Sequence, residues 1–133
     1  MYVELHCHSY FSLLDGASSP EALVEWAAML GYPALALTDH NGLYGAVRFW
    51  RAARERGLKP IIGAEVSLDG ACTEAVEGAC PESSKRTHPE LVEGGNHLTL
   101  LAETQRGYAN LCRILSTAQL AGQKGQPQLT LDT

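Results

Sequence analysis

The chain has 133 residues, of which 45% are hydrophobic and 19% charged, and its formal net charge is -5. This length and composition are typical of one globular domain. The acidic balance offers no basic surface for nucleic acid, and no apolar run approaches the roughly 20 residues of a membrane span. The four cysteines lack C-x-x-C spacing, which argues against a zinc knuckle or a disulfide framework. We therefore expect a cytoplasmic protein with reduced thiols and no membrane partner.

The first predicted element is a short strand from Val3 to His8 that ends in two histidines. His6 and His8 lie two residues apart, so both side chains point to one side of the strand and Cys7 points to the other. An H-x-H pair at the end of a buried strand favours metal binding over a purely structural role. Asp15 follows in the next loop, where it is either a turn residue beside a glycine or a further ligand.

A helix is predicted next, beginning at Ser18-Ser19-Pro20-Glu21 and running to Gly31. A serine cap, a proline in the first turn and a nearby glutamate satisfy the free amides of a helix start. Apolar residues at intervals of three and four predict one buried face. Its members are Leu23, Trp26, Ala27 and Leu30.

The second predicted strand runs from Ala34 and ends in Thr38-Asp39-His40. A helix from about Tyr44 to Arg56 follows it and stops at Gly57, a residue suited to a left-handed cap. The arginines of this helix are interpreted as a solvated outer face rather than as a phosphate-binding stripe.

A third strand is predicted from Pro60 to Leu68, a fourth from His97 to Ala102, and a last helix from about Tyr108 to Ala118. Between the third and fourth strands, residues 69–96 carry six acidic and two basic residues. The stretch Thr73–Ala79 is echoed sixteen residues later by Pro89–Gly95. A long segment of this kind, without sustained apolar periodicity, predicts a disordered surface insertion.

Strands and helices thus alternate, which predicts an α/β fold with about four parallel strands joined by right-handed crossovers. The carboxyl ends of parallel strands lie on one face of such a fold. His6, His8, Asp39, His40 and Glu65 are therefore expected around one point. Imidazole nitrogens and carboxylate oxygens together suit Zn²⁺, Mn²⁺ or Fe²⁺.

Two histidines are excluded from this predicted site. His97 opens its strand, and five residues at roughly 3.3 Å each would place it on the order of 16 Å from the metal-binding face. His88 falls inside the repeat-like insertion. Neither is expected to bind metal.

The motifs carry a family resemblance. The H-x-H-S of His6–Ser9, the T-D-H of Thr38–His40 and the Gly63–Glu65 segment resemble the polymerase-and-histidinol-phosphatase (PHP) domain. More narrowly, residues 35–47 and 97–111 are similar to the amino-terminal PHP domain of bacterial DNA polymerase III alpha subunits. The tail, residues 124–132, resembles the error-prone branch of these polymerases.

The resemblance implies a distorted (β/α)7 barrel with up to three divalent metals, Zn²⁺ or Mn²⁺, at the carboxyl ends of its strands. It implies that His6, His8 and Glu65 hold adjoining metals, and that Asp15 and His40 serve another. Asp39 would orient a ligand ring or assist proton transfer. The family's remaining ligands come from later strands, so residues 1–133 are expected to be a truncated, incomplete barrel that is inactive alone.

The function implied is metal-dependent hydrolysis of a phosphate ester, at a DNA 3′ end or on pyrophosphate. The domain would belong to a DNA polymerase of replication or repair synthesis, with DNA and other replication subunits as partners. A free-standing phosphatase of the histidinol-phosphate type is one alternative, which the match of the fourth strand and last helix to the polymerase pattern disfavours. A catalytically silent structural domain is another, and the sequence leaves it open.

Overall fold

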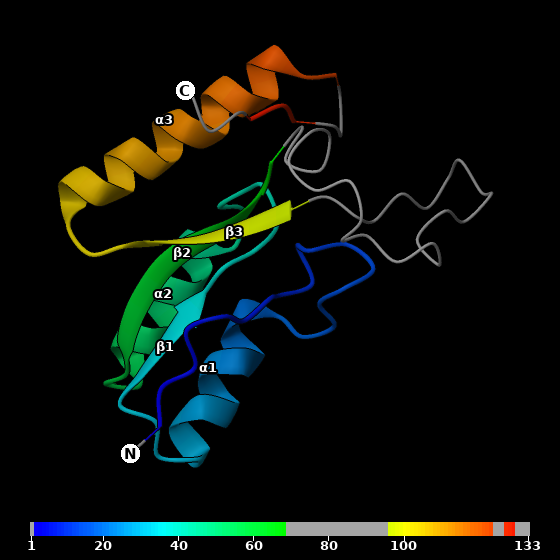
Figure 1. The fold of residues 1–133 in the computed structure, drawn as a ribbon. Coiled ribbons are helices and arrows are strands. Elements are labelled where there is room, and N and C mark those ends of the chain that lie inside the picture. The colour runs from blue at the N-terminus through cyan, green and yellow to red at the C-terminus, as the bar shows by residue number, and fades with distance from the viewer. Residues whose placement is uncertain (1, 69–95, 124–126, 130–133) are drawn as a thin grey trace, which may run out of the picture.

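The computed structural model describes residues 2–68, 96–123 and 127–129, which form an α/β fold (Figure 1). Helices and strands alternate along most of the chain, as the sequence predicts. The predicted insertion lies outside the described residues except for Asn96, which begins a strand. The elements are α1 (Pro20–Met29), β1 (Ala34–Leu37), α2 (Ala46–Glu55), β2 (Lys59–Leu68), β3 (Asn96–Ala102) and α3 (Gln105–Ala121).

The three strands form one mixed sheet in the order β1-β2-β3. Strands β1 and β2 are parallel, with Ala34 opposite Lys59, whereas β2 and β3 are antiparallel, with Glu65 opposite Thr99. The predicted parallel orientation of residues 97–102 is therefore wrong. A parallel pair needs a crossover, usually a helix, and no helix is predicted between β2 and β3, so the chain returns in the antiparallel direction.

The predicted strand from Val3 to His8 forms no regular ladder, so the sheet has three strands within the described residues instead of about four. The segment still lies beside β1 in parallel, through a bridge between Glu4 and Leu35. Its carbonyls accept hydrogen bonds from the amides of Ala36 (2.9 Å) and Thr38 (2.8 Å). Its own amides instead donate to side chains, that of His6 to the Glu4 carboxylate and that of Cys7 to the Thr38 hydroxyl. These local bonds replace the ladder.

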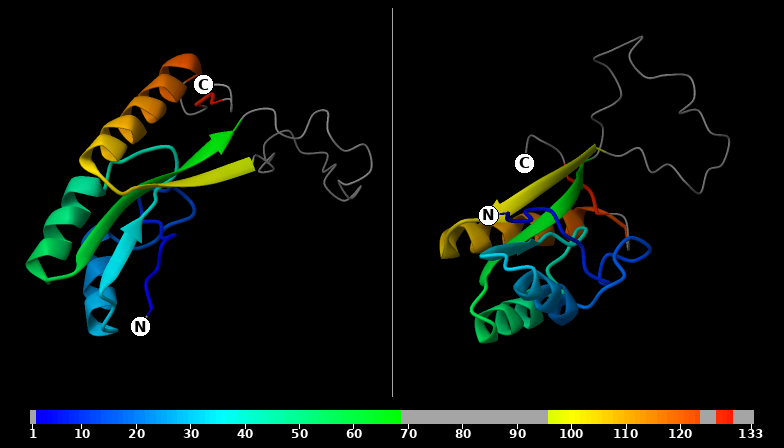
Figure 2. Two further views of the ribbon diagram at one scale, coloured as in Figure 1. Left: turned by 60° about the vertical axis from the view of Figure 1, so that its left-hand side comes forward. Right: turned by 90° about the horizontal axis from the view of Figure 1, so that it is seen from below.

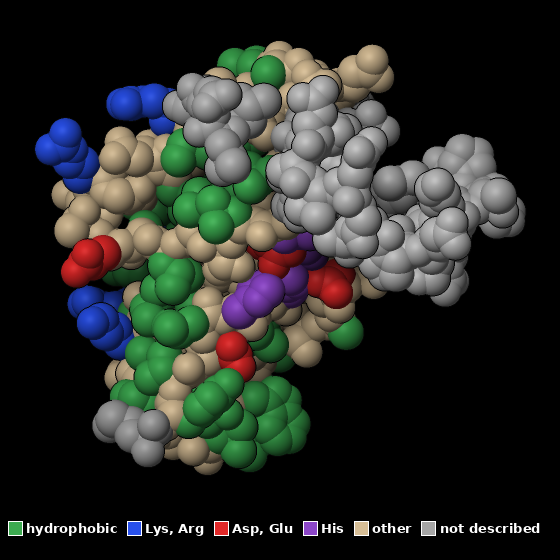
Figure 3. Space-filling view, viewed as in Figure 1, with side chains coloured by type: hydrophobic (Ala, Val, Ile, Leu, Met, Phe, Trp, Pro, Cys, Tyr) green, Lys and Arg blue, Asp and Glu red, His purple; other side chains and the backbone are tan. Residues whose placement is uncertain are grey.

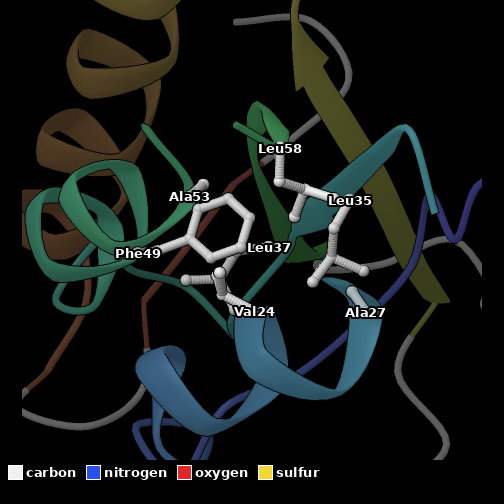
Figure 4. Packing of buried hydrophobic residues seen from close by; sticks show 7 residues of the cluster. All are labelled: Val24, Ala27, Leu35, Leu37, Phe49, Ala53 and Leu58. Atoms are coloured by element: carbon white, nitrogen blue, oxygen red, sulfur yellow. The ribbon is translucent and has the colours of Figure 1, made fainter. Parts of the chain in front are cut away.

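All three helices lie on one side of the sheet, as the left view of Figure 2 shows. Ile62 packs with the core under α1 and α2, while Ala64 and Val66 pack with the core under α3. These three residues alternate along β2 and so share a face. Phe49 of α2 is fully buried at the centre of the first core, as Figure 4 shows. It is surrounded by Val24, Ala27, Leu35, Leu37, Ala53 and Leu58.

Helix α1 buries a stripe that only partly matches the predicted one. Pro20, Val24 and Ala27 are buried and Leu23 packs against the core, whereas Trp26 and Leu30 are 60% and 63% exposed. The N-cap is Ser19, whose hydroxyl accepts a hydrogen bond from the amide of Ala22 at 3.1 Å. The helix is therefore confirmed, and the buried face predicted for it is right for Leu23 and Ala27 but wrong for Trp26 and Leu30.

Two ion pairs join α1 to α2 at the surface. The guanidinium of Arg48 donates to both carboxylate oxygens of Glu21, at 2.7 and 2.9 Å, and lowers the pKa of Glu21 by doing so. Arg56 donates to Glu25 at 3.1 Å. Exposed pairs of this kind contribute about 0–1 kcal/mol each. These arginines thus lie on a solvated outer face, as interpreted from the sequence.

No helix within the described residues is both long and apolar enough to cross a membrane.

Cys7 points to the helix side of the sheet, where it packs against the Phe49 core. Burial raises the pKa of its thiol to about 11. A raised pKa keeps the thiol neutral until the pH approaches that value, and the neutral form is a poor nucleophile. We expect Cys7 to be alkylated by iodoacetamide at pH 8 at least 10-fold more slowly than a free cysteine (pKa about 8.5). Peptide mapping by mass spectrometry measures this rate, and equal labelling of folded and unfolded protein would contradict the expectation.

Candidate metal centre

Six side chains meet at the edge of the sheet where β1 and β2 end and β3 begins. The antiparallel direction of β3 brings its first residues to the same edge as the last residues of β1 and β2. Figure 3 shows histidine and acidic side chains gathered near the middle of the molecular surface in that view. The six are His6, His8, Asp15, His40, Glu65 and His97.

Glu65 is the centre of the group and is only 5% exposed. One carboxylate oxygen, Oε2, contacts Nε2 of His6 and lies 3.3 Å from Nε2 of His8. The other, Oε1, lies 3.4 Å from Nδ1 of His40 and 3.1 Å from Nδ1 of His97. One carboxylate therefore faces four imidazoles.

The backbone fixes Glu65 next to His40. The amide of Glu65 donates to the carbonyl of Asp39 at 3.1 Å, and the amide of Asn41 donates to the carbonyl of Glu65 at 2.7 Å. These bonds form a parallel bridge between His40 and Glu65 beyond the end of β1. The order of strands thus sets the distance between these two side chains.

Asp15 reaches the centre from the loop that follows the H-x-H segment. Its Oδ2 contacts Nδ1 of His8 and lies 3.1 Å from Nε2 of His40. Hydrogen bonds from His8 first, and then from His40, lower the pKa of Asp15. The sequence left two interpretations of Asp15 open, a turn residue or a metal ligand. The structure places its carboxylate among the histidines, as a ligand role requires.

A tight loop makes this placement of Asp15 possible. A Cβ at Gly16 would lie 1.9 Å from the carbonyl oxygen of Ser9, so only glycine permits the close approach of the two backbones. The amides of Asp15 and Gly16 both donate to the carbonyl of Ser12. Leu14 takes a positive φ of 68°, which is uncommon for a residue other than glycine.

Asp39 is 2% exposed and points into the loop below the histidines. Its carboxylate accepts hydrogen bonds from the amide of Ser9 (2.7 Å), the hydroxyl of Ser9 (2.8 Å) and the hydroxyl of Ser12 (2.8 Å). The Ser12 hydroxyl in turn accepts from the backbone amide of His40 at 3.1 Å. Asp39 is thus bonded to the loop that carries Asp15, and it reaches His40 through Ser12 and the backbone.

His97 is the residue that sequence reasoning excluded, and the structure places its ring against Glu65. The expected separation on the order of 16 Å assumed a parallel fourth strand. In the antiparallel strand the first residues, not the last, lie at this edge, so the predicted separation is wrong and distance no longer excludes His97. The sequence predicts no crossover helix before His97, and this was the signal that could have shown the direction of the strand. His88, the other excluded histidine, lies outside the described residues.

The donors form three overlapping groups in which all ligand atoms lie within 4.8 Å of one another. Glu65 is a buried carboxylate surrounded by imidazoles, and a buried charge needs a compensating charge. Nitrogen and oxygen donors at this spacing fit divalent transition metals. The groups are His6, His8 and Glu65, then His8, Asp15 and His40, and finally His40, Glu65 and His97.

A family comparison agrees with this geometry. The model of the PHP domain matches residues 4–133, nearly the whole chain. The chain belongs to the PHP-domain family. The resemblance inferred from the H-x-H, T-D-H and Gly63–Glu65 motifs is thereby confirmed.

The sequence relatives of this PHP domain are bacterial DNA polymerases. Error-prone DNA polymerase of Mycobacterium tuberculosis is 49% identical over 132 residues, which are 98% of this chain and 11% of that polymerase. The enzyme of Mycolicibacterium paratuberculosis is 50% identical over 133 residues, again 98% and 11%. The DNA polymerase III alpha subunit of Buchnera aphidicola is 39% identical over 98% of this chain and 10% of its own. The chain thus spans about a tenth of the length of these relatives.

Solved structures share the fold of this PHP domain. An amidohydrolase from Chromobacterium violaceum, with bound sulfate and no metal, aligns with a TM-score of 0.56 and 27% identity. The alignment covers 84% of this chain and 32% of that one. A protein of Bifidobacterium adolescentis assigned as a metal-dependent phosphoesterase gives 0.55 and 21%, over 87% and 34% of the two chains. The predicted α/β fold class is confirmed, and the chain matches about a third of each of these solved structures.

Proposed function

We propose that this PHP domain binds two or three divalent metals, Zn²⁺ or Mn²⁺, and hydrolyses phosphate esters. The proposed ligands are those predicted from the sequence, His6, His8, Asp15, His40 and Glu65, together with His97. The observation that carries the proposal is the set of three overlapping donor groups. Glu65, His8 and His40 each belong to two of the three groups. Shared donors would hold neighbouring ions close enough to contact the same phosphate.

Each side chain has a defined task in this proposal. Glu65 bridges the histidines, and its burial excludes water from the carboxylate. Asp15 supplies an exposed oxygen donor beside His8 and His40. Divalent cations would supply Lewis acidity, which neutralises phosphate oxygens and activates water for attack on phosphorus. Asp39 acts through the loop, because its hydrogen bonds go to Ser9 and Ser12.

The biological setting we propose is a DNA polymerase of the error-prone type. The support is the identity of 49–50% to mycobacterial error-prone polymerases, higher than the 39% to a polymerase III alpha subunit. The proposed substrate is then a DNA 3′ end or pyrophosphate, the partners are DNA and other replication or repair subunits, and the location is the cytoplasm. The polymerase active site would lie in the parent protein beyond these residues.

The proposal is tested on the longest natural polypeptide that contains this chain. Metal is removed with a chelator and then restored as Mn²⁺ or Zn²⁺, and bound metal is measured by plasma mass spectrometry. We expect hydrolysis of a 3′-labelled oligonucleotide or of pyrophosphate to disappear with the metal and to return with it. The His8→Ala variant should show neither metal-restored hydrolysis nor full metal content.

A different outcome would favour the structural alternative. A protein that binds metal and melts at a higher temperature with it, yet hydrolyses no phosphate ester, has a centre that only stabilises the fold. That result would contradict the hydrolase proposal.

A further inference from the structure

A cleft of about 710 Å³ opens beside the metal centre. Its lining includes Asp15, His40 and His97 of the metal centre. It also includes Phe11, Leu13, Leu14 and Tyr44, which we call the apolar wall. None of the described residues that line the cleft is a lysine or an arginine. Apart from the proposed metal ligands, the lining combines this aromatic and aliphatic surface with four uncharged polar side chains, those of Ser12, Asn41, Ser67 and Gln119.

Tyr44 presents the most accessible aromatic ring of this wall. It is 68% exposed, and its ring lies 6.3 Å from that of Phe11, with an angle of 34° between the planes. Beneath the Tyr44 ring lies Gly42, where a Cβ would approach a ring carbon at 2.4 Å. The absence of a side chain at Gly42 therefore lets the ring lie against the backbone.

The leucines extend the same apolar wall toward the ligand Asp15. Leu13 is 83% exposed, and Leu14 is fully exposed with its positive φ of 68°. Backbone strain of this kind is often found at functional sites. An apolar tip next to a metal ligand, held in a strained conformation, fits contact with an apolar part of a substrate.

We propose that this wall, and Tyr44 above all, stacks against the base of the terminal nucleotide of a single DNA strand whose phosphate lies at the metal centre. This inference rests on the proposed function and names the substrate class. Inorganic pyrophosphate has no surface that could use the aromatic wall, whereas every nucleobase has an apolar face. Stacking of a base on an aromatic ring also tolerates any sequence.

Binding is measured without hydrolysis. A single-stranded oligonucleotide carries 2-aminopurine at its 3′ end, behind a phosphorothioate linkage that slows cleavage, and stacking quenches its fluorescence. The probe is added to the longest natural polypeptide that contains this chain. We expect quenching in the original protein and in Tyr44→Phe, and roughly tenfold weaker binding with less quenching in Tyr44→Ala. Gly42→Ala, which displaces the ring, should resemble Tyr44→Ala.

Trp26→Ala is the matched control, because Trp26 is an exposed aromatic residue on α1 that does not line the cleft. It should bind and quench like the original protein. A second measurement compares kcat/KM for the oligonucleotide with that for glycerol phosphate, which has no base. Tyr44→Ala should lower this ratio about tenfold.

The two proposals fail in different ways. Undiminished quenching in both Tyr44→Ala and Gly42→Ala would overturn the stacking inference even if glycerol phosphate is hydrolysed. An equal loss of activity on both substrates would also overturn it, because the wall would then serve the fold or pack against another part of the protein. Loss of quenching in Tyr44→Ala without hydrolysis of any substrate would support the stacking inference and contradict the proposed function.

Discussion

Replacing Glu65 with glutamine is expected to remove most of the bound metal and to lower phosphate-ester hydrolysis by more than about 100-fold. Changes to residues that only support a metal ligand typically cost about 10- to 100-fold. The substitution of Glu65 should lower metal affinity and hydrolysis further, because its two carboxylate oxygens face four imidazoles. These belong to His6, His8, His40 and His97. Glutamine keeps the size of the side chain but removes the negative charge and one acceptor oxygen.

The measurement is metal content by plasma mass spectrometry and hydrolysis under saturating Mn²⁺. Glu103→Gln is the matched control, because Glu103 is exposed in the turn between β3 and α3. Circular dichroism verifies that both variants remain folded. Full metal content and full turnover in Glu65→Gln would show that this carboxylate does not hold the metals.

Replacing Asp39 with alanine is expected to lower the free energy of unfolding by about 3 kcal/mol. The substitution leaves three buried donors of Ser9 and Ser12 without their acceptor, and each unpaired group costs about 1–3 kcal/mol. The loop that carries Asp15 would lose its anchor. Metal affinity should therefore fall as well, by about 10- to 100-fold.

Urea denaturation of the metal-free protein measures the first effect, and metal titration measures the second. Glu103→Ala, at an exposed position, should change the free energy of unfolding by no more than about 0.5 kcal/mol. Asp39→Asn keeps one oxygen acceptor and should fall between the original protein and Asp39→Ala. A loss below 1 kcal/mol in Asp39→Ala would mean that Ser9 and Ser12 find other partners.

Much of the site was predictable, because each segment ends in its chemistry-bearing residues. Parallel β1 and β2 carry His40 and Glu65 to one edge, and the period of two along residues 6–8 turns both histidines toward Glu65. These juxtapositions follow from strand geometry alone. The close approach of Asp15 could not be predicted with the same certainty, since it depends on the backbone contact of Gly16 with Ser9.

The predicted direction of β3 was wrong, and this error placed His97 far from the site. Periodicity alone cannot decide the direction of a strand. Alternation of apolar residues in 96–102 predicts a strand equally well in either direction. Direction depends on the connection, and the sequence before β3 predicts no crossover helix. The partly misplaced face of α1 has a different origin, because its sequence offers more apolar residues than one side of a helix can bury. Packing against β1 and α2 buries Val24 with Ala27 and leaves Trp26 and Leu30 exposed.

The antiparallel ladder between β2 and β3 also fixes the position of His97. That position therefore does not depend on how many residues join the two strands. Seven residue pairs, from Ile62 opposite Ala102 to Leu68 opposite Asn96, fix the register. Doubling a flexible connection changes its closure free energy by only about 0.6 kcal/mol. Relatives could therefore lengthen, shorten or exchange the sequence that joins these strands while the histidine keeps its place.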